Sequence, residues 1–328
     1  MTKIDISAHI IPPGLRRVAS LTAGGRIAFT QLPVLDSLDA RFKVMDKFPD
    51  VVQILSVAHT IEHAGTPKVV YELARVAKDE MAELVVKYPD RFVGVAAIMP
   101  LTDIDLALRE TDHAIKELGC KGIMIAADAS RPLDKPEFMA VYEKMAGYDL
   151  PIWIHPMGDH RRPDYDGEKE SKYRMWGLWG WPYQTTLAMT RLVFSGVFDR
   201  FPNIKFITHH AGAMLPFNSY RIHNWFDPAA ERKEDFMMRL KKHPADYFRM
   251  FYNDTANCGN TSGLMCAHDF FGTDHLLFAS DMPYGMPSGY GDTLYENTIK
   301  YVEKMKITAA DKERIFAGNA RKLFRIKG

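Results

Sequence analysis

Short apolar segments alternate with longer helix-like segments along this chain of 328 residues, and this alternation limits the folds that it can adopt. Most of the short segments are continuously apolar, which is typical of β-strands covered on both faces. Strands are predicted at residues 4–6, 51–57, 92–98, 122–125, 151–154, 205–208, 251–254 and 276–279. A strand followed by a helix, eight times over, indicates a parallel sheet.

Helix start and stop signals lie between the predicted strands. Thr66 followed by Pro67 is typical of a capping residue before a proline in the first turn of a helix. Thr102 or Asp103 can cap the next helix. Gly119 suits the left-handed residue that ends that helix. Right-handed crossovers repeated around the sheet predict a (β/α)8 barrel of one domain, residues 1–328. The alternative is an open doubly wound sheet, but no GxGxxG loop follows the first strand to support a dinucleotide-binding version of it.

Two regions interrupt the alternation. Residues 158–182 follow the fifth predicted strand and hold a charged stretch and three tryptophans. Residues 227–247 are a charged, helix-like insertion before the seventh strand. Loops that follow the strands of a barrel lie on the face that carries the active site. The first region therefore predicts a long loop that forms a lid or a pocket wall.

The composition excludes several classes of protein. The 42 basic and 41 acidic residues nearly cancel, so nucleic acid is not expected as a partner. No apolar run approaches the ~20 residues that a membrane span needs, and the N-terminus lacks the layout of a secretion signal. Three cysteines without a CxxC pair do not favour a disulfide framework or a thiolate zinc site. We expect a cytoplasmic protein that has no membrane contact.

Imidazole and carboxylate side chains gather just after the predicted strands. The residues are Ser7 and His9 after the first strand, His155 after the fifth, His209 and His210 after the sixth, and Asp281 after the eighth. In a barrel these positions converge on one mouth. Imidazoles together with a carboxylate are the ligands that a divalent metal such as zinc requires.

Four segments of the sequence, in this order, resemble one family. They are IDISAHIIPP near the start, RLVFSGVFDRFPNIKFITHHAGAMLPF in the middle, then FASDMPYG, and RIFAGNARKLF near the end. The chain resembles the amidohydrolase superfamily, and specifically its aminocarboxymuconate-semialdehyde decarboxylase-like branch. That branch also contains the γ-resorcylate and related aromatic acid decarboxylases. The resemblance covers nearly the whole chain.

The resemblance implies roles for individual residues. His9 and His155 would bind a metal, and Asp281 would bind the metal and exchange a proton with substrate or water. His210, and not His209, would be the acid or base, because His210 keeps the family spacing to the proline that follows.

The resemblance also suggests residues that bind the substrate. Arg221 falls where the muconate decarboxylase has an arginine that grips a substrate carboxylate, a task that suits a guanidinium fork. Trp176 and Trp179 suit a flat unsaturated substrate. Alternatively, Arg221 could be a surface ion-pair partner, and the tryptophans could anchor the long loop or fill a subunit contact.

Ser7 departs from the family pattern, because that position usually holds His or Glu. A serine hydroxyl is a poor metal ligand beside imidazole or carboxylate. Three outcomes are open: the metal stays and water or substrate fills the vacancy, the metal binds weakly, or no metal binds and a proton-transfer cluster remains. The expected cofactor is a divalent metal, zinc or manganese, with no organic cofactor.

The predicted function is non-oxidative decarboxylation of a small aromatic or unsaturated carboxylic acid, with Asp281 and His210 in proton transfer. One alternative is a metal-dependent hydrolase or hydratase of a ring-cleavage product or lactone. Another is a non-catalytic binding barrel whose metal site has decayed. The expected partners are a small carboxylate substrate and further copies of the chain, because the branch commonly forms dimers or tetramers.

Overall fold

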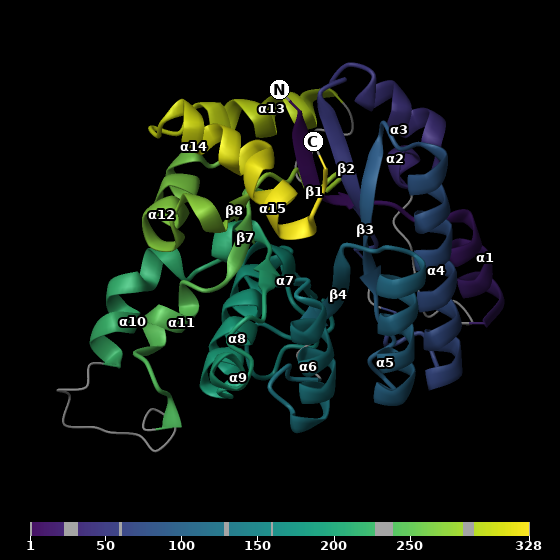
Figure 1. Ribbon diagram of the computed structural model, residues 1–328. Helices are drawn as coiled ribbons and strands as arrows, with labels where there is room; N and C mark the ends of the chain where they lie inside the picture. The colour runs from purple at the N-terminus through teal and green to yellow at the C-terminus, as the bar shows by residue number, and fades with distance from the viewer. Residues whose placement is uncertain are drawn as a thin grey trace.

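Eight parallel strands form one sheet in sequence order, β1 to β8 (Figure 1). The computed structural model describes residues 2–22, 32–58, 61–127, 131–158, 160–226, 239–284 and 292–327. The strands are β1 (Lys3–His9), β2 (Val51–Ser56), β3 (Phe92–Ile98), β4 (Gly122–Ala127), β5 (Ile152–Pro156), β6 (Phe206–Thr208), β7 (Tyr252–Asp254) and β8 (Leu276–Leu277). All eight predicted strands are confirmed, with ends shifted by up to three residues.

Hydrogen bonds between the first strand and the last segment close the sheet. The backbone N–H of Ile6 donates to Phe278 O at 3.0 Å, and that of His9 donates to Met282 O at 2.7 Å. Ala8 and Met282 also form a parallel bridge. The sheet is therefore a barrel, as predicted, and the carboxyl ends of its strands share one mouth.

Helices surround the barrel. They are α1 (Pro13–Thr22), α2 (Pro33–Asp36), α3 (Leu38–Met45), α4 (Pro67–Lys87), α5 (Ile104–Asp112), α6 (Met139–Tyr148), α7 (Met175–Leu178), α8 (Gly180–Phe194), α9 (Val197–Arg200), α10 (Ser219–Trp225), α11 (Pro244–Phe248), α12 (Thr261–Phe271), α13 (Asp292–Glu303), α14 (Ala309–Glu313) and α15 (Asn319–Phe324). Asp103 caps α5 by accepting a hydrogen bond from Leu106 N. Thr66 is the N-cap residue of α4 and Pro67 its first helical residue, as predicted, although the Thr66 hydroxyl makes no capping hydrogen bond.

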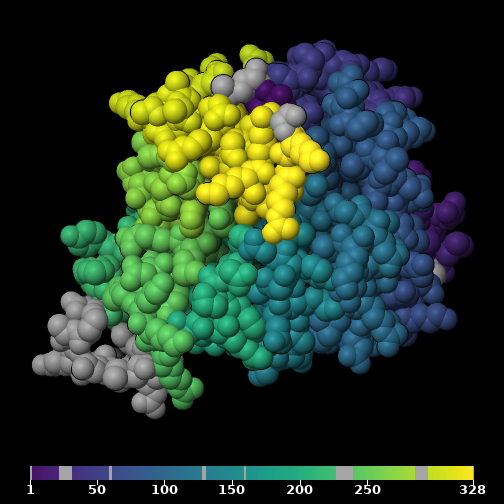
Figure 2. Space-filling view, in the orientation of Figure 1, coloured from purple at the N-terminus to yellow at the C-terminus, as the bar shows by residue number. Residues whose placement is uncertain are grey.

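The interior of the barrel is apolar, and the C-terminal helix covers one end of it. Ile4, Ile207 and Trp153 belong to one buried cluster together with Phe324 of α15. The rings of Trp153 and Phe324 stack with centroids 5.1 Å apart. Figure 2 shows the C-terminal residues, in yellow, lying against this face of the molecule. Each such buried aromatic or aliphatic side chain stabilises the fold by about 1.5–3 kcal/mol.

An irregularity in β1 decides which of its side chains face the mouth. Ile4 and Ile6 pack in the interior cluster, whereas Asp5 accepts a hydrogen bond from Tyr295 of α13, outside the sheet. The pairing of β1 with β2 shifts register between Asp5 and Ala8. An extra residue in a strand changes which side chains face each side. His9 consequently also points inward, at the carboxyl end of the strand.

The two regions that interrupt the alternation of strands and helices, residues 158–182 and 227–247, differ in part from what the sequence predicts. The end of the segment 158–182 is helical, because α7, which carries Trp176, and the start of α8, which carries Trp181, lie there, with Trp179 between them. Of the insertion 227–247, residues 227–238 lie outside the described residues, and the described remainder includes the start of α11. None of the helices in the described ranges has the length and apolar character that crossing a membrane would demand.

Candidate active site

Three side chains from opposite parts of the chain meet at the mouth. His9 from β1, His155 from β5 and Asp281 after β8 each offer a ligand atom, and these atoms all lie within 4.8 Å of one another. This separation is close to what ligands of one ion require, since metal–nitrogen and metal–oxygen bonds are about 2 Å long. The structure thus brings together the three residues that the resemblance predicts as metal ligands.

The His9 imidazole is held from both sides. Its Nδ1 lies 2.8 Å from the hydroxyl of Ser56, at the end of β2, and its Nε2 lies 3.0 Å from Asp281 Oδ1. His9 is fully buried. Because Nδ1 has a partner of its own, Nε2 is the nitrogen that faces the carboxylate, as in imidazoles that bind metals.

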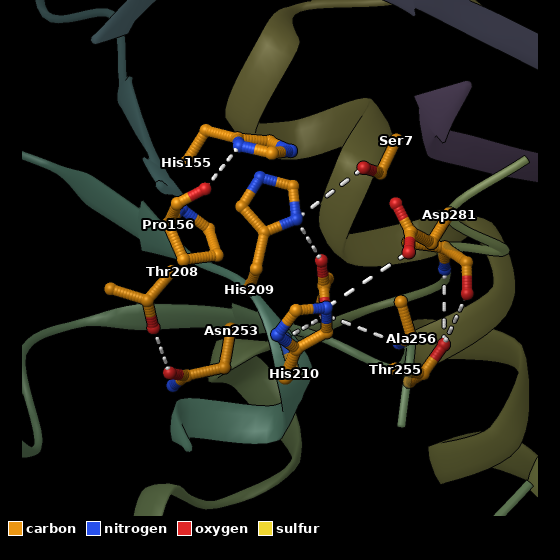
Figure 3. Close-up of polar contacts among 12 residues, drawn as sticks. Ser7, His155, Pro156, Thr208, His209, His210, Asn253, Thr255, Ala256 and Asp281 are labelled. Atoms are coloured by element: carbon orange, nitrogen blue, oxygen red, sulfur yellow. Dashed lines mark hydrogen bonds and ion pairs between the residues drawn. The ribbon is translucent and has the colours of Figure 1, made fainter. Parts of the chain in front are cut away.

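His155 is oriented in the same way by the backbone. Its Nδ1 lies 2.8 Å from the carbonyl oxygen of Pro156, as Figure 3 shows. Burial, together with the neighbouring His209 and His9, holds the pKa of His155 well below its ordinary value. A neutral imidazole with its Nδ1 engaged presents Nε2 as a lone pair. The donor set therefore fits zinc or manganese, both of which accept imidazole and carboxylate ligands.

The two adjacent histidines after β6 take different places. His209 is 1% exposed and its ring centroid is 4.8 Å from that of His155. His210 Nε2 lies 3.9 Å from Asp281 Oδ2. Asp254 at the end of β7 holds both residues: its Oδ2 is 2.9 Å from His209 Nδ1, and its Oδ1 accepts the backbone N–H of His210 at 2.8 Å. The sequence-based choice of His210 alone thus leaves out a second histidine of the site.

His210 and Asp281 influence each other's protonation. Burial alone would raise the pKa of Asp281, but contacts with His210 and His9 lower it well below its ordinary value. Burial alone would lower the pKa of His210, but the carboxylate of Asp281 more than offsets this and raises it. The contacts therefore favour a charged imidazolium beside a charged carboxylate.

Ser7 lies inside the centre, fully buried, and its hydroxyl contacts two imidazoles. Its Oγ is 3.4 Å from His9 Nε2 and 3.5 Å from His209 Nδ1. Ser7, the residue that departs from the family pattern, thus lies where a longer side chain would reach His9, His155 and Asp281. A hydroxyl there is shorter than the histidine or glutamate side chain that the resemblance leads us to expect at this position.

A buried polar network supports the centre from outside the barrel. Asp5 accepts the backbone N–H groups of Ser7 and Ser280, at 3.1 and 3.0 Å, and the hydroxyl of Tyr295 at 2.8 Å. Tyr295 in turn accepts a hydrogen bond from Gln53. Burial raises the pKa of Asp5 above its ordinary value, although these donors oppose the shift.

Arg41 extends this network to the backbone of His9. Its guanidinium donates to Gln53 Oε1 at 2.7 Å and to the carbonyl oxygen of His9. Arg41 is fully buried, which is rare for a charged residue unless hydrogen bonds compensate the lost water, as these do. A polar Asp5 within an apolar strand was the one signal of this network in the sequence.

The predicted substrate-binding residues lie in two places. Trp176 packs edge-to-face on Trp181 with centroids 5.5 Å apart, and Trp181 stacks on His210 at 6.3 Å. Trp179 is 54% exposed and lines a separate groove with Trp176 and Tyr183. Trp181 is therefore the tryptophan whose ring contacts the centre.

A close approach at Gly158 joins these tryptophans to the end of β5. A Cβ there would lie 2.5 Å from Trp176 Cε3 and 2.6 Å from Trp181 Nε1, so any larger residue would push the rings away. Arg221 is exposed on α10, where its guanidinium lies 5.5 Å from the ring centroid of Trp225. Within the described part of the chain, no contact joins Arg221 to the three donors.

Comparison with known proteins places this site in a family. The family model described as Amidohydrolase matches residues 4–326. The chain is 31% identical over 311 residues to γ-resorcylate decarboxylase of Polaromonas sp. strain JS666, covering 89% of both. It is 26% identical over 346 residues to 2-amino-3-carboxymuconate-6-semialdehyde decarboxylase of Dictyostelium discoideum, covering 97% of this chain and 90% of that one.

A solved structure is similar over the same length. It is a dihydroxybenzoic acid decarboxylase of Polaromonas sp. JS666 with bound manganese and the inhibitor 2-nitroresorcinol. Its TM-score is 0.78 at 28% identity, and the match covers 99% of this chain and 97% of that one. With the barrel, the ligand cluster and a family match across nearly every residue, the chain belongs to the amidohydrolase family.

Proposed function

We propose that this protein is a non-oxidative decarboxylase, a carboxy-lyase, of a small aromatic or unsaturated carboxylic acid. The observation that carries the proposal is the meeting of His9, His155 and Asp281 at the barrel mouth, with His210 beside Asp281. The decarboxylase relatives, which span nearly the whole chain, support the same reaction class.

The protein's first task is to hold the substrate's carboxylate in place. A divalent metal held by His9, His155 and Asp281 would act as a Lewis acid and an orienting template for the carboxylate and a neighbouring oxygen. Ser56 and the Pro156 carbonyl keep the two imidazoles turned so that Nε2 faces the centre. Such fixed orientation lowers the entropic part of the barrier.

The second task is to supply a proton to carbon. Decarboxylation breaks the bond between the ring carbon and the carboxyl carbon, and a carbon–hydrogen bond replaces it as CO2 leaves. His210 and Asp281, 3.9 Å apart, are the pair positioned to deliver that proton. Positioned acids of this kind contribute about 10²–10⁴-fold in rate. Trp181 stacks on His210, so its ring lies beside the pair.

The experiment that tests the proposal measures CO2 release from hydroxybenzoic acids by the protein loaded with Mn²⁺ or Zn²⁺. We expect release from at least one acid, and Asp281→Asn should abolish it while circular dichroism stays unchanged. The matched control is Asp269→Asn, since Asp269 lies on α12 with its side chain 76% exposed. A fully active Asp281→Asn protein would disprove the proton-transfer role.

Hydration of an unsaturated acid is the second candidate, because Ser7 places a short neutral hydroxyl 3.4 Å from His9 Nε2, at a position where the family usually has a histidine or glutamate. The same assay separates the two reactions. A hydratase consumes the unsaturated substrate without releasing CO2, and its product gains the mass of one water. Assembly into dimers or tetramers and a cytoplasmic location stay predictions from the sequence.

A further inference from the structure

The backbone turns sharply at His210, directly after β6. His209 is still extended, with φ −83° and ψ 161°, whereas His210 and Ala211 have left-handed φ values of 61° and 56°. Residues other than glycine rarely adopt such values, because the Cβ atom then crowds the backbone carbonyl oxygen. Asp281, the partner of His210, has a φ of 58°. This backbone costs free energy, so contacts elsewhere in the fold must hold it.

The turn sends two adjacent imidazoles in different directions. The ring of His209 lies beside that of His155, with centroids 4.8 Å apart, while His210 Nε2 lies 3.9 Å from Asp281 Oδ2. Figure 3 shows the two rings separated, with that of His209 toward His155 and that of His210 toward Asp281. The backbone dihedrals of a residue set the direction of its side chain. The place of the His210 ring beside Asp281 therefore depends on the left-handed backbone at residue 210.

One buried carboxylate binds both residues at this turn. Asp254, at the end of β7, accepts the backbone N–H of His210 at 2.8 Å through Oδ1, and its Oδ2 lies 2.9 Å from His209 Nδ1. Oδ1 also accepts the backbone N–H of Ala256 at 3.1 Å, which fixes the carboxylate at the end of its own strand. Asp254 is fully buried. Hydrogen bonds to a carboxylate are strong where water is excluded.

The later part of the turn is held by different contacts. A Cβ atom on Gly212 would lie 2.4 Å from Phe271 Cε2, so the turn packs closely on α12. The backbone N–H of Ala213 donates to His210 O at 2.9 Å. These contacts fix the backbone after His210, but neither of them engages the N–H of His210. That N–H, at the point where the backbone changes from extended to left-handed, is bound by Asp254.

We propose that Asp254 is a positioning residue for the decarboxylation: its carboxylate holds His210 in the left-handed conformation that directs the imidazole toward Asp281. The inference rests on the decarboxylase function proposed above. Without the carboxylate, the N–H of His210 loses its acceptor, residue 210 relaxes toward a negative φ, and its ring leaves Asp281. The three predicted metal ligands come from other strands, so turnover should suffer far more than substrate binding.

The test compares two substitutions of Asp254. Asp254→Ala removes both oxygens, whereas Asp254→Asn keeps Oδ1 for the N–H groups of His210 and Ala256 and turns its amide toward His209. Both kcat and KM are measured by CO2 release from the hydroxybenzoic acid that the Mn²⁺-loaded unchanged protein decarboxylates fastest. We expect Asp254→Ala to lower kcat by roughly 10–100-fold and to change KM by less than about threefold. Asp254→Asn should keep kcat within about threefold of that of the unchanged protein.

A second measurement does not depend on activity. Hydrogen–deuterium exchange of the backbone amides of residues 209–213 reports whether the turn is held. We expect exchange to be at least about tenfold faster in Asp254→Ala and unchanged in Asp254→Asn. Should Asp254→Ala not fold, Asp254→Leu, which fills the same space, takes its place.

Glycine at position 211 provides a rescue, because glycine adopts a positive φ without strain. Adding Ala211→Gly to Asp254→Ala should recover at least about threefold in kcat, since the turn then forms more readily. Asp103→Ala is the matched control, because Asp103 also accepts a backbone N–H, that of Leu106 at the start of α5. The control should lower the thermal midpoint, as loss of a helix cap does, and leave kcat and exchange at residues 209–213 unchanged.

The outcomes separate this inference from the proposed function. Equal kcat in Asp254→Ala and the unchanged protein, or an Asp254→Asn protein as slow as Asp254→Ala, would overturn the positioning role. Faster exchange in Asp254→Ala, with no CO2 release by the unchanged protein, would refute the decarboxylase function alone. Slow CO2 release by Asp254→Ala with unchanged exchange at residues 209–213 would show that Asp254 does not act through this turn.

Discussion

The hydroxyl of Ser56 lies 2.8 Å from Nδ1 of His9 and so decides which nitrogen of that imidazole faces Asp281. The two residues end neighbouring strands, β2 and β1, and are paired in register. A residue that orients a ligand typically contributes 10–100-fold to metal affinity. The relationship leads directly to a measurable prediction.

Ser56→Ala should weaken Mn²⁺ and Zn²⁺ binding by roughly 10–100-fold, because the His9 ring loses the partner of its Nδ1. Equilibrium dialysis followed by elemental analysis measures the change. Ser195→Ala is the control, since Ser195 bonds the carbonyl of Leu192 at the end of α8, away from the centre. Equal metal affinity in the two variants would show that Ser56 does not orient His9.

Ser7→Glu should raise metal affinity roughly tenfold, because a carboxylate beside His9 adds an anionic donor where a neutral hydroxyl stands. Metal content after dialysis against a dilute chelator gives the readout, with the unchanged protein dialysed in parallel. The thermal midpoint of the metal-free variant controls for crowding at this buried position. Metal retention that does not rise would mean that Ser7 does not occupy a ligand position.

Asp5→Asn should destabilise the protein on the order of 3 kcal/mol, because an amide cannot accept all the hydrogen bonds that the buried carboxylate accepts from Ser7, Ser280 and Tyr295. Urea unfolding measures the difference in the free energy of unfolding. Asp90→Asn, on the surface, should change it by less than about 0.5 kcal/mol. Similar values for both variants would remove the supporting role of this network.

The contacts of Asp149 should contribute to the stability of the fold, and this contribution should disappear in acid. Hydrogen bonds from Lys205 and Arg325 hold its pKa below the ordinary value of 3.8. The unfolded chain therefore takes up this proton at a higher pH than the folded chain does. The contribution of Asp149 to the free energy of unfolding is therefore complete above pH 3.8. It is lost as the pH falls through the lower pKa that Asp149 has in the folded protein.

Asp149→Asn tests this contribution, because Asn tolerates the positive φ of 56° at this position. The stability deficit of the variant should be largest near neutral pH and should shrink below about pH 3. Thermal midpoints from pH 2 to pH 7 measure it. A deficit that is the same at every pH would mean that the ion pairs of Asp149 do not carry it.

Much of the architecture follows from the sequence because the controlling patterns are local. A continuously apolar segment such as β3 is a strand covered on both faces wherever it lies, and eight of them with intervening helices leave few topologies. The meeting of His9, His155 and Asp281 can likewise be predicted, because the carboxyl ends of parallel strands in a barrel must converge.

Only the tertiary structure decided what depends on side chains that are distant in sequence. The spacing along the chain favoured His210, yet packing against Asp254 and His155 also brings His209 into the site. The register shift in β1 separates Asp5, which faces α13, from Ser7 in the centre, and no local pattern marks such a shift. The partners Ser56 and Arg41 are equally ordinary residues in the sequence. Their roles arise from closure of the barrel, which places strand ends beside one another regardless of their separation along the chain.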